Sequence, residues 1–254
     1  MTFDRNVILL DDVSSSIKNR KSRLYESHIG SVEIYKAQEV EKSLKLIQSR
    51  LESGIHAVCC FSYDLGLVFQ GLPPKASSLN SPLIRAWFFS EYRKLSSTEV
   101  DEWIESRLNL ERKQQAEIDG GIVDVKFEID EKTFCENIDS IHSQIREGDT
   151  YQVNYTFNVT GKTYGSTIGL YKRLRQRQHC RYGALICCEG NRILSFSPEL
   201  FLSKTGINIL TKPMKGTLSA REYSSKDLKN DKKNRAENVM IVDLLRNDLS
   251  RISE

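Results

Sequence analysis

Residues 182–204 read YGALICCEGNRILSFSPELFLSK and hold three strand candidates in succession. Residues 182–188, 192–197 and 199–204 are each rich in apolar side chains, and turn-forming residues separate them. Runs of strands followed by helices, without regular strand–helix alternation, are typical of α+β proteins. This stretch therefore favours an α+β fold over a doubly wound parallel sheet.

Further strands are expected on both sides of this stretch. Each is marked by an apolar run or by alternation of apolar and polar residues. These strands are residues 7–10, 29–35, 55–62, 83–89, 123–127, 151–160 and 207–210. A loop rich in Ser, Pro and Asn is expected at residues 73–82.

Five helices are predicted from apolar residues that recur at helical spacing. They are residues 40–51, 100–108 (within a polar segment at 95–119), 134–145, 167–176 and 232–249. Gly54 is expected to end the first helix, and Gly148 is placed as the C-cap of the third.

Composition indicates an ordinary soluble globular protein. The chain has 254 residues and a mass of 29.1 kDa, and 39% of its residues are hydrophobic and 28% charged. A net charge of +3 is too small to imply a nucleic-acid partner. The apolar run at residues 7–10 is too short to cross a membrane, and none of the six cysteines forms a CxxC pair. We therefore expect a cytoplasmic protein with reduced thiols.

The densest basic run, residues 172–177, falls on the fourth predicted helix. No aromatic residues for stacking on bases are interleaved with it. The run is therefore interpreted as a solvated helix face rather than a nucleic-acid contact.

Four motifs stand out in the second half of the chain. They are GDTYQVN at residues 148–154, SPELF at 197–201, PMKGT at 213–217 and RAENVMIVDLLRND at 235–248. In this order and spacing they resemble the chorismate-utilising enzymes. FSYDLG at residues 61–66 is similar to the aminating members of that family, so the resemblance covers nearly the whole chain.

The resemblance implies a fold like that of anthranilate synthase component I. That fold is a two-layer antiparallel β-sheet core with helices on the outside. It implies one chorismate-binding-type domain, with residues 1–119 as an N-terminal subregion and 120–254 as the start of the core. In the family the fold continues further, so this chain is expected to be truncated at its C-terminal end and to have little activity on its own.

Two residues match the family's catalytic positions. Glu199 matches the general acid, which protonates the C4 hydroxyl of chorismate as it leaves. Lys215 stands where aminodeoxychorismate synthases have Lys and anthranilate synthase has Ala. The resemblance implies that its neutral amine attacks C2 of the ring and that ammonia then resolves the adduct at C4.

Other positions match substrate and metal contacts. Gln152 stands where isochorismate and salicylate synthases place a Lys that activates water; a Gln can orient ammonia but cannot deprotonate water. Gly216 and Thr217 are expected to contact the substrate. Glu237 matches a carboxylate that binds Mg²⁺, which in turn holds the C1 carboxylate of chorismate.

The preferred reading is amination of chorismate to 4-amino-4-deoxychorismate, the precursor of p-aminobenzoate and folate. No glutaminase motif is present in this sequence, so the resemblance implies that ammonia comes from a separate glutamine amidotransferase subunit. One alternative is anthranilate synthase component I, which Lys215 disfavours. Another is a non-catalytic remnant or amidotransferase-binding module.

Overall fold

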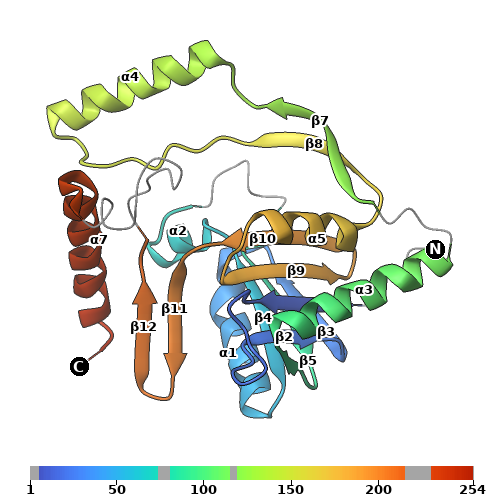
Figure 1. The fold of residues 1–254 in the computed structure, drawn as a ribbon. Coiled ribbons are helices and arrows are strands. Elements are labelled where there is room, and N and C mark those ends of the chain that lie inside the picture. The colour runs from blue at the N-terminus through green and yellow to red at the C-terminus, as the bar shows by residue number, and fades with distance from the viewer. Residues whose placement is uncertain (1–5, 74–80, 115–118, 215–229, 254) are drawn as a thin grey trace. The chain divides into compact units, whose positions relative to one another are not determined.

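The computed structural model describes residues 6–73, 81–114, 119–214 and 230–253. Helices and strands are mixed, and every pairing between named strands is antiparallel (Figure 1). The chain forms two compact units. One unit joins Met1–Trp103 with Arg175–Glu254, and the other is Ile104–Leu174.

A five-stranded sheet with the order β10-β9-β1-β2-β6 lies in the first unit. Its strands are β1 (Val7–Asp11), β2 (Ser22–Tyr25), β6 (Arg93–Leu95), β9 (Tyr182–Cys188) and β10 (Asn191–Ser197). Strand β1 is paired on both edges, since Ile8 lies opposite Tyr25 on one side and Ile186 on the other. This pairing explains why Val7, Ile8 and Leu9 of the short apolar run are buried.

A three-stranded sheet with the order β3-β5-β4 completes the core of this unit. Its strands are β3 (His28–Ile34), β4 (His56–Phe61) and β5 (Ile84–Phe89). Because side chains alternate along β5, Ala86 and Phe88 pack in one cluster with Val40 and Ile47 of helix α1 (Val40–Glu52). Trp87 and Phe89 point to the opposite face and join a cluster that includes Ile8 and Ile186 of the larger sheet.

The first unit also contains a hairpin and several helices. Strands β11 (Leu200–Thr205) and β12 (Asn208–Lys212) are joined at Gly206, whose φ of 58° suits a tight turn. The helices are η1 (Ala37–Glu39), α2 (Leu65–Phe69), α7 (Lys232–Ser250) and the first part of α3 (Ser97–Lys113). At the start of α3, the Ser96 hydroxyl accepts the Glu99 amide and the Glu99 carboxylate accepts the Ser96 amide, which is a capping box.

The second unit is built on the pair β7 (Gly121–Phe127) and β8 (Val159–Tyr164). Helix α4 (Glu131–Glu147) connects them, and most of α5 (Thr167–Arg177) follows. Asp130 caps α4 by accepting the Thr133 amide at 2.8 Å. Gly148 ends it with a φ of 83°, which confirms the predicted C-cap.

Most predicted elements are present, but the strand predicted at residues 151–160 is wrong. Strand β8 begins only at Val159, because the pairing with β7 covers residues 159–164 and does not extend to the residues before them. The alternation there has another cause. Tyr155 and Phe157 turn their rings toward Phe134 of α4, with centroids 5.7 and 6.0 Å away.

The two short strands β2 and β6 were not expected from the sequence. The pairing of β1 with β9 links residues from both expected subregions in one sheet, and the boundary at residue 119 stays a prediction. The expected loop at residues 73–82 falls largely outside the described residues. None of the helices in the described ranges is both long enough and apolar enough to span a bilayer.

Candidate functional site

Glu199 lies in the short connection between β10 and β11, where the chain leaves the five-stranded sheet and enters the hairpin. The Ser197 hydroxyl, at the end of β10, contacts the Glu199 backbone twice. It donates to the carbonyl oxygen at 3.2 Å and accepts from the amide nitrogen at 3.4 Å. Glu199 itself is exposed, so its carboxyl group is open to a substrate.

The Glu199 carboxylate also accepts a hydrogen bond from the backbone of Met214, with 3.0 Å between Oε1 and the amide nitrogen. The ladder of the hairpin explains this contact. Leu200 pairs with Lys212, so the next ladder position falls at Pro213, which has no N–H to donate. The following amide, that of Met214, donates to the side chain of Glu199.

Three predicted site residues come directly after Met214. Lys215, Gly216 and Thr217 lie outside the described residues. The structure nevertheless brings the residue before Lys215 into hydrogen-bond contact with Glu199. Met214 therefore lies next to Glu199 although fifteen residues separate the two in sequence.

Glu237 lies half-buried on α7, near the amino-terminal end of the helix. Asp231 caps this end by accepting the Asn234 amide at 2.7 Å. Among the residues described, no three His, Cys, Asp or Glu side chains gather closely enough to hold a metal ion. A Glu carboxylate can supply one oxygen ligand to Mg²⁺, which also keeps waters and substrate oxygens in its shell; the magnesium role of Glu237 stays a prediction.

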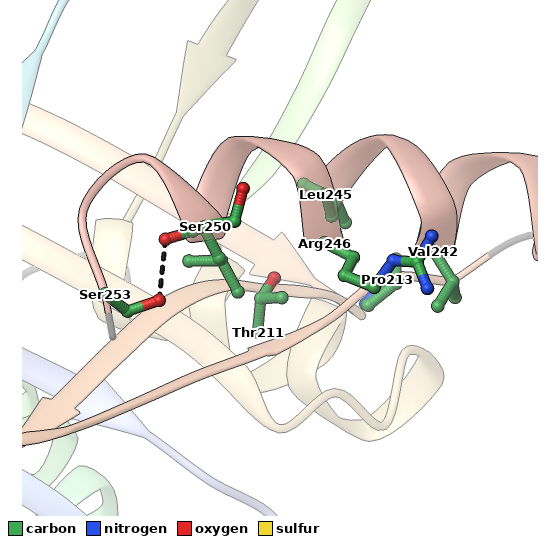
Figure 2. Close-up of a pocket in the computed structure, with 8 residues that line it drawn as sticks. Thr211, Pro213, Val242, Leu245, Arg246, Ser250 and Ser253 are labelled. Atoms are coloured by element: carbon green, nitrogen blue, oxygen red, sulfur yellow. Dashed lines mark hydrogen bonds between the residues drawn. The ribbon is translucent and has the colours of Figure 1, made fainter.

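A cavity of about 490 Å³ lies between the end of β12 and the carboxyl-terminal half of α7 (Figure 2). Its apolar lining comes from Pro213, Val242, Leu245 and Leu249. Arg246 also lines it and is ion-paired with a carboxylate on the same helix. The cavity reaches Pro213, two residues before the predicted nucleophile.

Gln152 follows α4 in a segment without regular structure and is half-buried. The Thr150 hydroxyl donates to its backbone carbonyl at 3.2 Å. Gln152 belongs to the unit Ile104–Leu174, whereas Glu199 and Glu237 belong to the other unit. The predicted action of Gln152 together with the acid and the metal ligand stays a prediction.

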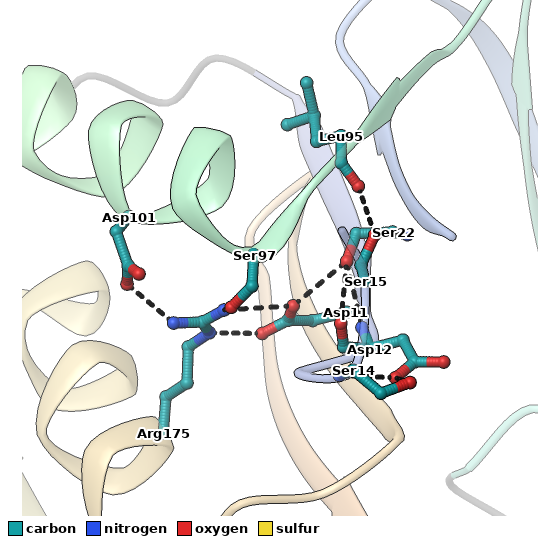
Figure 3. Close-up of polar contacts among 9 residues, drawn as sticks. All are labelled: Asp11, Asp12, Ser14, Ser15, Ser22, Leu95, Ser97, Asp101 and Arg175. Atoms are coloured by element: carbon teal, nitrogen blue, oxygen red, sulfur yellow. Dashed lines mark hydrogen bonds and ion pairs between the residues drawn. The ribbon is translucent and has the colours of Figure 1, made fainter. Parts of the chain in front are cut away.

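Sequence reasoning missed a polar cluster around Arg175 (Figure 3). The expectation that residues 172–177 form a solvated face is wrong for this residue, because its side chain is only 8% exposed. The Arg175 guanidinium donates to the Asp11 carboxylate at 2.5 Å, to Asp101 at 2.6 Å and to the Ser97 hydroxyl at 2.9 Å. The cluster joins β1, α3 and α5. No local signal reveals it, since Asp11 is 164 residues away in sequence.

The chain is similar to one protein family over almost its whole length. The sequence profile of the family described as chorismate binding enzyme matches residues 5–254. This range contains all six predicted site residues, both those that the structure describes and those that it does not.

Individual relatives fall into two named groups. An aminodeoxychorismate synthase component 1 from Klebsiella aerogenes is 29% identical over 215 residues, which cover 78% of this chain and 48% of the relative. One from Bacillus subtilis is 35% identical over 129 residues, covering 48% of this chain and 27% of the relative. An anthranilate synthase component 1 from Haloarcula marismortui is 35% identical over 133 residues, which cover 50% of this chain and 26% of the relative. The chain therefore covers less than half the length of each of these relatives.

Proposed function

Because the chain belongs to the chorismate binding enzyme family, we propose that it acts in the amination of chorismate to 4-amino-4-deoxychorismate, toward p-aminobenzoate and folate. The hydrogen bond from the Met214 amide to the Glu199 carboxylate carries this proposal. It draws a carboxyl group and the residue preceding Lys215 together, as an acid and a nucleophile acting on one small ring require. The similarity to proteins named aminodeoxychorismate synthase component 1 supports the same reaction.

The proposed roles follow from the chemistry of the leaving group. Hydroxide leaves a ring poorly near neutral pH, so Glu199 acts as the general acid that protonates the departing C4 oxygen. Lys215 forms a bond from Nζ to C2 while the ring double bonds shift and the C4–O bond breaks, releasing water. Ammonia then adds at C4 and the bond to Lys215 breaks. The lysine must be neutral to attack, so it must lose one proton first.

The remaining predicted residues hold the reactants. Gln152 is proposed to orient ammonia, because its side chain both donates and accepts hydrogen bonds. Gly216 and Thr217 are proposed to contact the ring substituents. Glu237 would hold Mg²⁺, whose charge would bind the C1 carboxylate of chorismate. Ammonia would come from a separate glutamine amidotransferase subunit. A core of two antiparallel sheet layers, as in the family, is proposed for the fold.

The covalent step gives a direct test that does not need steady-state turnover. Chorismate and Mg²⁺ are mixed with the chain in the absence of ammonia, and the intact protein is weighed by mass spectrometry. We expect a mass gain of one chorismate less one water, and proteolytic mapping should place it on Lys215. Added ammonia should discharge the adduct and release 4-amino-4-deoxychorismate.

Lys215→Arg is the matched control variant. Arginine keeps the positive charge, but it does not lose its proton in proteins and so cannot attack. It should form no adduct, and Glu199→Gln should form it about 10² to 10⁴ times more slowly. An equal yield of adduct in Lys215→Arg, or no adduct together with no chorismate-dependent rise in melting temperature, would contradict the proposal.

A second candidate, anthranilate formation, is favoured by the relatives named anthranilate synthase component 1. Product analysis separates the two. Anthranilate is aromatic and fluorescent as released, whereas 4-amino-4-deoxychorismate becomes aromatic only after a separate lyase acts. A fluorescent product formed without added lyase would replace the first proposal with the second.

A further inference from the structure

We propose that Ser197 is a positioning residue, which, together with the Met214 amide, fixes the Glu199 carboxyl group so that Oε2 carries the transferable proton. The inference rests on the proposed role of Glu199 as the acid. It goes further by assigning the proton to one of the two oxygens and the orientation to a neighbouring hydroxyl.

The backbone of Glu199 is held at both of its polar groups by one side chain. Ser197 is the last residue of β10 and is anchored in the sheet opposite Tyr182. Its hydroxyl donates to the Glu199 carbonyl and accepts from the Glu199 amide. Pro198 between them has a fixed φ near −65°. The backbone between the end of β10 and Glu199 therefore has little conformational freedom.

The carboxyl group is held at one oxygen from the other side of the hairpin. The Met214 amide donates to Oε1 at 3.0 Å. In a protonated carboxyl group the carbonyl oxygen is the better acceptor, and the hydroxyl oxygen is the donor. An N–H bonded to Oε1 therefore favours the acid form in which Oε1 is the carbonyl oxygen and Oε2 bears the hydrogen.

Loss of this arrangement should slow the reaction. Without the Ser197 hydroxyl, the Glu199 backbone is freed at both polar groups and the carboxyl group can leave the Met214 amide. Misplacement of a catalytic group by about 1 Å can lower a rate by about 10²-fold. Substrate binding through other residues should be unaffected, so the loss should fall on kcat rather than on KM.

The test uses the methionine amides as reporters. The sequence contains three methionines, Met1, Met214 and Met240. Labelling with ¹⁵N-methionine leaves Met214 and Met240 as the two internal amides to resolve by NMR. Met240 lies on α7 and serves as the internal control. A charge-assisted N–H···O⁻ hydrogen bond is stronger than a neutral one, so the Met214 amide proton should resonate downfield.

Three variants give distinct expected shifts. Glu199→Gln should move the Met214 amide proton upfield, because the charged acceptor is replaced. Ser197→Ala should move it in the same direction by at least half as much. Ser197→Thr keeps a hydroxyl and should leave it near its original position. Met240 should not move in any variant, and melting temperatures of the three variants should show that each remains folded.

The inference is overturned if Ser197→Ala leaves the Met214 amide unchanged while Glu199→Gln shifts it, or if neither variant shifts it. With chorismate, ammonia and Mg²⁺, Ser197→Ala should lower kcat by about 10- to 100-fold with KM unchanged, and Ser197→Thr should restore it. If the unaltered protein neither aminates chorismate nor forms the covalent adduct, the proposed function fails, and the NMR shifts still decide the positioning of Glu199.

Discussion

The guanidinium of Arg175 lies 2.5 Å from the Asp11 carboxylate, and their side chains are only 8% and 2% exposed. The same guanidinium reaches Asp101, which is largely open to solvent. The Ser22 hydroxyl donates a further hydrogen bond to Asp11. One buried cation therefore connects the first strand, the start of α3 and the end of α5.

Arg175→Ala should lower the free energy of unfolding by about 3–5 kcal/mol, because it leaves the Asp11 charge buried without its counter-ion. Urea unfolding followed by circular dichroism measures the change. Arg177→Ala, on the same helix but exposed, is the control and should change stability by less than about 0.5 kcal/mol. Equal effects of the two variants would show that the buried pair does not stabilise the fold.

The capping box of α3 predicts how stability depends on acid. Hydrogen bonds from Arg20 and from the Ser96 amide hold the pKa of Glu99 at about 2, below its ordinary value of 4.5. The pKa of Glu99 is lower in the folded state than in the unfolded state. The stabilisation that this carboxylate contributes is therefore fully present above about pH 4.5 and is lost as the pH falls toward 2. Glu99→Gln should lower the melting temperature at pH 7 and flatten its fall between pH 5 and pH 3. Glu102→Gln, exposed on the same helix, should follow the unaltered protein.

Gly120 is predicted to tolerate no side chain. A Cβ atom there would lie 2.0 Å from the Ser166 carbonyl oxygen and 2.7 Å from the Leu170 amide nitrogen, so the backbone would have to move. Gly120→Ala should destabilise the protein by about 1–3 kcal/mol. Gly66→Ala is the control, because nothing lies within 4 Å of its Cβ position. Urea unfolding of both variants tests this, and similar midpoints would contradict it.

The cysteines should differ widely in reactivity. Burial raises the pKa of Cys59 to about 11, so at pH 8 only about one thiol in a thousand is the reactive thiolate. Cys135 on α4 is exposed. Iodoacetamide at pH 8 should therefore label Cys135 long before Cys59, as peptide mass mapping would show. Labelling of Cys59 at the same rate under native conditions would disprove its burial.

Sequence patterns predicted the elements whose signals are local. The stripe that includes Val40 and Ile47 predicted α1, and Gly148 predicted the end of α4, because helix periodicity and the left-handed C-cap depend on neighbouring residues alone. Strands β2 and β6 were missed. Each has only three or four residues, and they form because β2 pairs with β1 and β6 pairs with β2.

The motifs proposed site residues, and these stay predictions, but the motifs did not reveal the contacts that the structure shows around Glu199. Two motifs contain Glu199 and Met214, yet the hydrogen bond between them depends on the register of the β11–β12 ladder, which no motif reports. The strand predicted at residues 151–160 failed for a related reason. Tyr155 alternates with polar neighbours because it packs on α4, and its hydroxyl accepts a hydrogen bond from Asn137 at 2.6 Å.

The sheet order has a consequence for biosynthesis. Val7 of β1 pairs with Cys187 of β9, so the ribosome completes the second partner long after the first. At a synthesis rate of about 5–20 residues per second, this delay is roughly 10 to 40 s. During that interval the nascent chain presents the edge of β1, with Ile8 and Leu9, to the surrounding cell. Chaperone capacity and translation speed should therefore influence the yield of folded protein.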